Sequence, residues 1–503
     1  MKHTSLPVRI ALCLLSMAFL LAAFAGCKNN ADDPANTTPP SGDNTGSDDG
    51  QEYDKNGYLK DTLPGDLNFS NQTVRILGWN SEVVEFDVES LNGVTIDEAI
   101  WHRNDTVSTR LGVNLDFVIT NGSVAYINDY KQVVQNAIMG GMPYDLLAAH
   151  TRSIAICASG GLLTDLNNIE GSYLDFSKPW WNQNIIEKTM LGNSLFFMTG
   201  DIAPSFVQMI YCVYFNADML RDRGIESPYD LVESNEWTLE NMMSMTINFY
   251  QDLNQNFAVD LNDNIPLVGQ YYDWPAFLHG CGVEMVVRNE SGDLVISPDL
   301  KGEKGINLMD DMLDWVILDN CYVATDDNIT QHFLGEKSMF MITQSGRAAM
   351  SFDKVTFEYG CVPMPKYDSA QENYISTSRQ PTTLWAMSRD IPTDRLGMVT
   401  ATMECLASEG YRQVTPAVFE TVMQYQTSAS PEMAEMLELI RDTAWFDFGR
   451  IYSSDLSSNG VMCDQPGIYL RDHKRWENYI NTVMPTIEGQ LAELSDELLS
   501  LIN

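Results

Sequence analysis

The alternation of strand and helix patterns between residues 73 and 147 is the feature that most constrains the fold of this chain. Segments 73–79, 113–119 and 144–147 have strand patterns, and residues with helical apolar spacing fill the two intervals between them. Strands that alternate with helices pair in parallel, because each helix carries the chain back across one face of the sheet. The sequence therefore predicts an α/β lobe in which helices cover a parallel sheet.

The first of these helices has a predicted start and a predicted end. Thr95 and Glu98 have the spacing of a capping box, in which a hydroxyl and a carboxylate satisfy free backbone amides. Gly112 follows the last apolar residue of the pattern, as a glycine commonly does at a helix end. We therefore expect a helix from about residue 95 to residue 111.

The amino terminus has the pattern of an export signal. Lys2 and Arg9 precede an almost wholly apolar run over residues 10–24, and small residues then lead to Cys27. This run is too short to span a bilayer comfortably, which indicates a secretory signal. The Ala-Gly-Cys ending resembles a bacterial lipobox, with Phe24 where the usual residue is Leu, so Cys27 is the predicted lipidation site. The alternative is an ordinary signal peptide followed by a chance cysteine.

The segment after the predicted signal is a candidate tether. With a signal over residues 1–26, residues 27–57 begin with the lipidated cysteine and contain hardly an aliphatic side chain. Such a segment cannot offset its chain entropy by burial, so we expect it to be disordered, with a reach of about 30 Å. This predicts a protein on the extracellular face of the cell membrane, attached to it through the lipid anchor only.

Charge and cysteine content exclude several classes of function. The 503 residues carry a formal net charge of −39, and an acidic surface repels phosphate backbones, which argues against nucleic-acid binding. Of nine cysteines, Cys13 and Cys27 belong to the predicted signal and lipid site, and the others are widely scattered. The sequence has no CxxC pair or Cys/His cluster, so it gives no support for a zinc or iron–sulfur site.

Longer stretches of the sequence resemble a known family. The early ones are "RNDTVSTRLGVNLDFV", "GGMPYDLLAAH" and "GGLLTDLNNI". The later ones are "YFNADMLRDRGIESPYD", "EWTLENMMSM", "FLGEKSMFMITQSGRAAM" and "YGCVPMPKYD". Together they resemble the family 1 extracellular solute-binding proteins, the ligand-capturing lipoproteins of ABC sugar importers.

The resemblance implies a fold and a function. The implied fold is α/β and two-lobed, of the periplasmic-binding-protein type (type II-like), with a hinge and a ligand cleft between the lobes. The implied division is lobe 1 at 58–198, lobe 2 at 199–330, a return to lobe 1 at 331–380, and a helical part of lobe 2 at 381–503.

The implied function is capture of a carbohydrate ligand, an oligosaccharide, without catalysis. The implied protein is a monomer that closes on this ligand and presents it to ABC permease subunits. Two other functions remain open. One is a surface enzyme that acts on glycans, and the other is a receptor lipoprotein that binds peptides or feeds a sensor.

Aromatic and polar residues near predicted strand ends form the candidate ligand site. A sugar presents apolar C–H faces and hydroxyl groups, so its site needs flat aromatic walls and polar side chains. A single tryptophan is more often a core residue than a ligand platform, so the prediction depends on the recurrence of such residues at inter-lobe junctions. The candidates are Trp79, Asn80, Glu82, Asp145, His150, Thr151, Asp201, Tyr272, Trp274, Gln344, Arg347 and Trp385.

One loop has the spacing of a calcium site. Oxygen ligands are expected from Asp252, Asn254, Asn256, Ala258, Asp260 and Asp263, the last of which replaces the usual bidentate Glu. Phe257 stands where a glycine normally makes the sharp turn. The loop is therefore a candidate structural calcium site, with a solvated polar turn as the alternative, and the sequence predicts no required cofactor.

Overall fold

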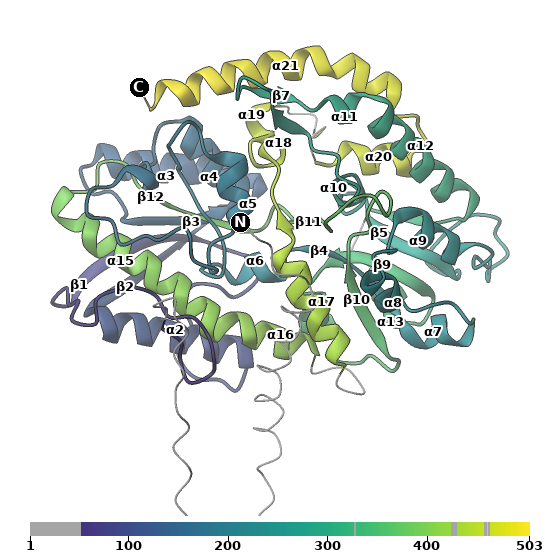
Figure 1. The fold of residues 1–503 in the computed structure, drawn as a ribbon, viewed down its shortest axis with the longest axis horizontal. Coiled ribbons are helices and arrows are strands. Elements are labelled where there is room, and N and C mark those ends of the chain that lie inside the picture. The colour runs from purple at the N-terminus through teal and green to yellow at the C-terminus, as the bar shows by residue number, and fades with distance from the viewer. Residues whose placement is uncertain (1–51, 326–327, 424–429, 457–459, 461–462, 503) are drawn as a thin grey trace, which may run out of the picture. The chain divides into compact units, whose positions relative to one another are not determined.

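The computed structural model describes residues 52–325, 328–423, 430–456, 460 and 463–502 (Figure 1). The chain divides into two compact units, residues 1–62 and 63–503. In the first unit, Tyr53 and Leu59 form an isolated antiparallel bridge. All helices and strands named below belong to the second unit. The predicted signal, Cys27 and most of the predicted tether lie outside the described residues.

The first sheet has four strands in the order β12-β3-β1-β2. Their bounds are β1 (Gln72–Trp79), β2 (Val113–Thr120), β3 (Leu146–His150) and β12 (Thr383–Met387). Strand β1 pairs in parallel with β2 and β3, and β12 pairs antiparallel with β3. The intervening helices are α2 (Thr95–Leu111) and α3 (Ile127–Met139), and α4 (Thr151–Ser159) follows β3. The predicted parallel β-α-β-α-β order is confirmed.

The second sheet has five strands in the order β10-β4-β9-β5-β8. Their bounds are β4 (Tyr211–Asn216), β5 (Ile265–Gln270), β8 (Tyr322–Ala324), β9 (Ser338–Gln344) and β10 (Tyr359–Pro363). Strand β5 is parallel to β8 and β9, whereas β4 is antiparallel to β9 and β10. Strands β4, β5, β9 and β10 are buried along their whole length, so this sheet forms the core of the second half.

The other elements are mostly short helices around the two sheets. Two small sheets pair β6 (Val286–Arg288) with β7 (Leu294–Ile296) and β11 (Ser376–Thr377) with β13 (Ala444–Trp445). Short 3-10 helices are η1 (Val124–Tyr126) and η2 (Leu166–Asn168), and η3 (Gly410–Val414) is a π-helix. The remaining helices are α5 (Gln183–Thr189), α6 (Pro204–Gln208), α7 (Ala217–Asp222), α8 (Pro228–Glu233), α9 (Leu239–Thr246), α10 (Ala276–Gly280), α11 (Pro298–Lys301), α12 (Glu303–Leu318), α13 (Ile329–Leu334), α14 (Arg347–Ser351), α15 (Thr393–Glu409), α16 (Thr415–Met423), α17 (Pro431–Asp442), α18 (Phe448–Ile451), α19 (Ser453–Leu456), α20 (Gln465–Arg471) and α21 (Glu477–Ser500).

The long helices near the carboxyl terminus contact both halves of the second unit. Helix α21 lies against α4 beside the first sheet and also against α11 and β7 (Figure 1). Helix α15 packs on α2, whereas α17 packs on β10 of the second sheet. None of the helices within the described ranges combines the length and apolar character needed to cross a bilayer.

The strand pairing corrects the predicted division into lobes. Residues 331–380 were expected to return to the first lobe, but β9 and β10 in this segment pair with β4 of the second sheet. The return comes later, at β12, and α15 then packs beside the first sheet, so residues 381–503 are not confined to the second lobe. Strand pairing is decided by hydrogen bonds between distant segments, which a local pattern cannot encode.

Candidate ligand-binding site

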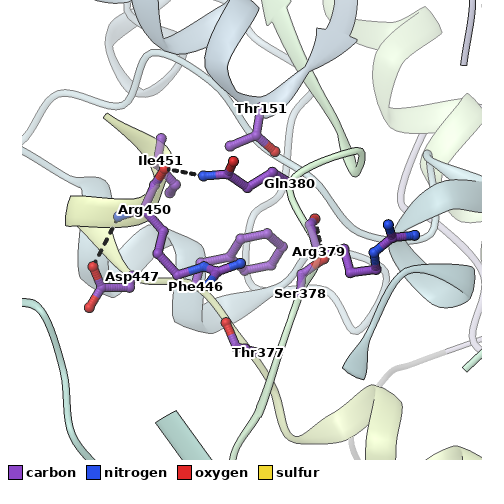
Figure 2. A pocket seen from close by; sticks show the side chains of 9 residues that line it. All are labelled: Thr151, Thr377, Ser378, Arg379, Gln380, Phe446, Asp447, Arg450 and Ile451. Atoms are coloured by element: carbon purple, nitrogen blue, oxygen red, sulfur yellow. Dashed lines mark hydrogen bonds between the residues drawn. The ribbon is translucent and has the colours of Figure 1, made fainter. Parts of the chain in front are cut away.

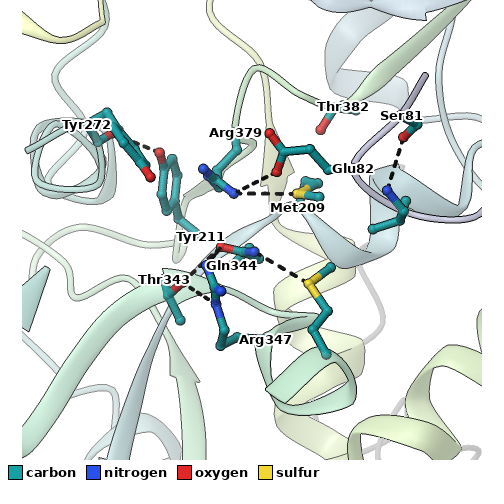
Figure 3. Close-up of polar contacts among 12 residues, drawn as sticks. Ser81, Glu82, Met209, Tyr211, Tyr272, Thr343, Gln344, Arg347, Arg379 and Thr382 are labelled. Atoms are coloured by element: carbon teal, nitrogen blue, oxygen red, sulfur yellow. Dashed lines mark hydrogen bonds and ion pairs between the residues drawn. The ribbon is translucent and has the colours of Figure 1, made fainter. Parts of the chain in front are cut away.

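Strand ends from both sheets contribute side chains to one polar group, which we name the inter-sheet cluster (Figure 3). Glu82 comes from the loop after β1, Tyr272 follows β5, and Arg379 lies just before β12. Tyr211 is the first residue of β4, Gln344 is the last residue of β9, and Arg347 opens α14. The inter-sheet cluster is defined as Glu82, Tyr211, Tyr272, Gln344, Arg347 and Arg379. In open α/β sheets, ligands bind outside such strand ends.

Arg379 connects the two sides of the inter-sheet cluster. Its guanidinium Nη1 lies 3.5 Å from the Glu82 carboxylate, and its Cζ lies 5.1 Å from the centre of the Tyr272 ring. Only 8% of Arg379 is exposed, whereas about half of the Glu82 side chain is exposed. Burial lowers the pKa of Arg379, but Tyr211, Asp273 and Glu82 raise it by more, so the net direction is upward. Arg379 is therefore a permanent buried cation.

Arg347 is the second cation of the inter-sheet cluster. Its Nε donates to Thr343 Oγ1 at 3.3 Å, and its Nη2 donates to Gln344 Oε1 at 3.2 Å. Burial raises the pKa of the neighbouring Asp273 to about 6, while the charges of Arg379 and Arg347 act in the opposite direction. The charges of both arginines therefore act on the Asp273 carboxyl group.

Tyr272 provides a flat aromatic surface in the inter-sheet cluster. The backbone carbonyl of Tyr272 accepts a hydrogen bond from the Tyr211 hydroxyl at 2.8 Å, which ties β4 to the loop after β5. Tyr272 is partly exposed and Tyr211 is buried. A half-exposed ring beside hydrogen-bonding side chains is the combination that a sugar ring requires.

A small pocket adjoins the inter-sheet cluster (Figure 2). Its walls come from Thr151, residues 377–380 and residues 446, 447, 450 and 451, and its free volume of about 10 Å³ suffices for about one water molecule. Arg450 lines the pocket and is 5% exposed, and among the described residues its Nη1 has no hydrogen-bond partner. Gln380 Nε2 donates to the Arg450 carbonyl at 2.8 Å and thereby fixes this wall.

Asp447 on the same wall is occupied by backbone donors. Its carboxylate accepts the amide N–H groups of Met285 at 2.6 Å and Arg450 at 3.1 Å. Burial raises the pKa of Asp447 to about 6, and these hydrogen bonds and the charge of Arg450 oppose that rise. The lining of the pocket therefore offers the Arg450 guanidinium as a hydrogen-bond donor that a ligand group could engage.

Several predicted site residues do lie in or beside the inter-sheet cluster. Glu82, Tyr272, Gln344 and Arg347 belong to it, and Thr151 lines the adjoining pocket, where its hydroxyl donates to the Thr382 carbonyl at 2.9 Å. No ligand contact tests their predicted role, so that role stays a prediction.

Two further candidates lie at strand ends of the first sheet but serve the backbone. His150 is buried and caps α4, since its Nδ1 accepts the N–H of Arg152 at 3.1 Å. Burial, with Arg152 and Arg379, lowers the pKa of His150 to about 3. Asn80 is exposed, and its Oδ1 accepts the N–H of Gly122 at 3.2 Å.

The three candidate tryptophans are core residues, and their expected role as solvent-facing platforms is wrong. Trp79 is 2% exposed and donates to Thr383 Oγ1 at 2.7 Å. Trp274 is fully buried and meets the Trp315 ring edge to face, with the centroids 6.0 Å apart. Trp385 in β12 is also buried. A position at a strand end does not determine the side to which a large ring turns, and burial of apolar area favours the interior.

Asp145 and Asp201 belong to buried ion pairs rather than to the inter-sheet cluster. Asp145 Oδ2 lies 2.7 Å from Arg395 and also accepts the N–H of Arg75 at 2.8 Å. Asp201 pairs with Arg441 and accepts a hydrogen bond from the Thr415 hydroxyl. These carboxylates are already occupied within the chain, so the prediction that they face a ligand is not supported by their surroundings.

Sequence reasoning missed Tyr211, Arg379 and Arg450. All three are largely buried, and each obtains its neighbours from distant parts of the chain. The one available signal for Arg379 is its scarcity, since the chain has 30 Lys and Arg against 69 Asp and Glu.

The predicted calcium loop is closed on itself by hydrogen bonds. Asp260 accepts the side-chain amides of Asn254 at 3.0 Å and Asn256 at 2.7 Å, and Asp252 accepts the N–H of Phe257 at 2.9 Å. Phe257 has the left-handed φ of 61° that a glycine normally adopts, and its side chain is almost fully exposed. Within the described ranges, no group of three or more His, Cys, Asp or Glu residues is arranged to hold a metal ion. Calcium binding stays a prediction.

Comparisons with known proteins identify the fold. No family model matches the sequence, and no curated protein matches it. A cyclic α-maltosyl-1,6-maltose binding protein from Arthrobacter globiformis has a TM-score of 0.56 at 11% identity, with 84% of this chain and 100% of that chain covered. UspC of M. tuberculosis has a TM-score of 0.52 at 12% identity, with 83% and 100% covered.

A third solved structure, a cyclo/maltodextrin-binding protein complexed with maltotetraose, has a TM-score of 0.51 at 11% identity, with 86% of this chain and 98% of that chain covered. Likeness at this level of identity concerns the fold alone. With its two mixed sheets and surrounding helices, the chain has the two-lobed α/β fold of the maltose-binding-protein type, as the sequence predicts.

Proposed function

We propose that this protein is an extracellular solute-binding lipoprotein that captures an oligosaccharide and presents it to the permease subunits of an ABC importer. The observation that supports this most is the inter-sheet cluster, in which strand ends of both sheets bring a half-exposed tyrosine ring and polar side chains together. Two solved structures with the same fold are described as binding maltodextrins or a cyclic maltosyl-maltose. A binding role without catalysis agrees with both observations.

The proposed mechanism is closure of the two lobes on the ligand. The chain passes from the first sheet to the second between β3 and β4, returns between β10 and β12, and crosses again among the carboxyl-terminal helices, so closure bends the chain at these crossings. Glu82 on the first side and Tyr272 on the second both contact Arg379. A ligand that touches both sides gains contacts only in the closed state and therefore shifts the population toward it.

The test is a thermal-shift screen of the purified protein against neutral oligosaccharides, acidic oligosaccharides and peptides. A ligand at 100 times its dissociation constant adds about 2.7 kcal/mol of stability, which is readily seen as a higher melting temperature. We expect a shift with one class of oligosaccharide and an unchanged glycan after prolonged incubation. A shift with peptides alone, or release of glycan products, would replace the proposal by a peptide receptor or a glycan-active enzyme.

A further inference from the structure

The inter-sheet cluster and its pocket concentrate positive charge in a chain whose formal net charge is −39. Arg347, Arg379 and Arg450 are 9%, 8% and 5% exposed. The charges of Arg379 and Arg450 both act on the Tyr211 hydroxyl, and those of Arg347 and Arg379 both act on Asp273. The three cations therefore share one region. Burial of a cation costs several kcal/mol unless an anion or strong hydrogen bonds compensate it.

The protein itself compensates Arg450 incompletely. The Asp447 carboxylate, which lines the same pocket, accepts the backbone amides of Met285 and Arg450. Among the described residues, Arg450 Nη1 has no hydrogen-bond acceptor.

Two carboxylates act on Arg379, the buried Asp273 and the exposed Glu82, and its contact with Glu82 is loose. The Glu82 carboxylate lies 3.5 Å away, beyond the roughly 2.7–2.9 Å of a strong charge-assisted hydrogen bond. The other contact of Nη1 is the Met209 sulfur at 3.8 Å, and a thioether is a weak acceptor. About half of the Glu82 side chain faces solvent, so its carboxylate can be hydrated when another anion replaces it on Arg379.

We propose that the captured oligosaccharide is acidic and that a sugar carboxylate, as in a uronic acid residue, takes the place of Glu82 on Arg379. This inference rests on the proposed function and names its ligand class. The planar guanidinium fork of Arg379 matches a carboxylate, and the Tyr272 ring beside it receives the apolar face of the sugar. Before the ligand binds, the Glu82 carboxylate occupies the position beside Arg379 that the sugar carboxylate takes.

The first test compares matched ligands by isothermal titration calorimetry on the purified protein. Trigalacturonate is set against its methyl ester, which has the same rings without the charges, and against maltotetraose and a sulfated neutral oligosaccharide. We expect the acid to bind at least about tenfold more tightly than its ester, because charge-assisted hydrogen bonds are lost in the ester.

Each other outcome has a separate meaning. Equal or tighter binding of the ester or of maltotetraose keeps the proposed function and overturns the acidic ligand. Binding of the sulfated sugar alone overturns the carboxylate as the recognised group. Binding of none of these sugars overturns the acidic ligand, and the proposed function falls with it only if peptides alone raise the melting temperature in the thermal-shift screen.

The second test uses variants of the ion pair. Arg379→Gln should weaken binding of trigalacturonate about 10- to 100-fold and binding of the ester by a clearly smaller factor. Glu82→Gln should strengthen binding of the acid about two- to fivefold, because it removes a competing anion worth about 0.5–1 kcal/mol. The control is Arg221→Gln, which changes an arginine with 65% of its side chain exposed, beyond the far end of β4.

The Glu82 variant keeps the proposal falsifiable if Arg379→Gln does not fold, because Glu82 is half exposed and its replacement leaves the core intact. Weaker or unchanged binding of the acid by Glu82→Gln would mean that Glu82 does not occupy the ligand's position. That result overturns the proposal.

Discussion

Replacement of Glu404 by glutamine tests whether burial or hydrogen bonding controls a carboxyl group in the core. Glu404 in α15 is 1% exposed and accepts the indole N–H groups of Trp180 and Trp181, both at 3.0 Å, and the backbone N–H of Asp175 at 3.2 Å. Burial raises its pKa to about 8 from an ordinary value of 4.5, although these hydrogen bonds oppose the rise. The folded protein therefore keeps a proton on Glu404 at neutral pH, where the unfolded chain has released it.

The sign and size of the effect follow from linkage. A carboxyl group whose pKa is raised on folding contributes no penalty below about pH 4.5 and progressively lowers stability as the pH rises to about 8. A shift of this size corresponds to roughly 5 kcal/mol, since one pKa unit is about 1.4 kcal/mol. Glutamine does not titrate, but its NH2 group cannot accept one of these N–H groups, a pH-independent loss of about 1–3 kcal/mol. We therefore expect the stability of Glu404→Gln relative to the unchanged protein to rise by several kcal/mol between pH 5 and pH 8.5.

The assay is urea unfolding followed by tryptophan fluorescence at several pH values between 5 and 8.5. Other titrating groups cancel in the difference between the two proteins, and Glu187→Gln, with 74% of its side chain exposed, serves as the control for an exposed carboxyl group. The reasoning is refuted if Glu404→Gln is the less stable protein and its deficit grows with pH. In that case the three N–H donors hold an ionised carboxylate, and hydrogen bonding outweighs burial.

Four further predictions follow from individual residues. Trp274→Ala should lower the free energy of unfolding by about 3–5 kcal/mol, measured by denaturant titration, because the ring is fully buried. Asp201→Asn should cost about 3–5 kcal/mol because it leaves Arg441 buried without its anion, whereas Asp442→Asn, with 60% of the side chain exposed, should cost less than about 1 kcal/mol. Calcium should raise the melting temperature relative to a chelator, and Asp252→Ala should abolish that rise; equal melting in both solutions would identify a solvated turn. Cys27→Ser should move the protein from the membrane fraction to the medium, and a variant that stays membrane-bound would contradict lipid anchoring.

The first sheet is predictable from the sequence because its signals are local. Apolar spacing alone defines β1, α2, β2 and α3, and the parallel order follows from the handedness of the connections. The helix start shows the limit of this accuracy. Val94 precedes the first helical residue, and Glu98 accepts the N–H of Gly93 at 2.9 Å, so the predicted reciprocal capping by Thr95 does not form.

The candidate site is predictable only in part, because local strand patterns place some of its residues and contacts between distant segments place the others. Tyr272 and Gln344 follow or end recognisable strands, and parallel strands present such ends along one edge. Arg379 has no local signal of this kind, since its anion comes from the loop after β1 and its aromatic neighbour from the end of β5. Trp79 and Trp274 have the local signal but lie in the core, because the surrounding packing decides the direction of a large side chain.

Glu82 and Glu85 show how two identical residues in one loop acquire opposite roles. Glu85 is buried and its carboxylate accepts the hydroxyls of Ser205 and Thr383, both at 2.7 Å, which joins the loop to α6 and β12. Burial raises the pKa of Glu85, and these hydrogen bonds oppose that rise. Glu85 fixes the loop to α6 and β12. Glu82 lies three residues earlier in this loop, where its exposed carboxylate reaches Arg379. The rigid contact at Glu85 therefore determines where the exchangeable contact at Glu82 forms, and a ligand carboxylate that displaces Glu82 need not disturb the loop.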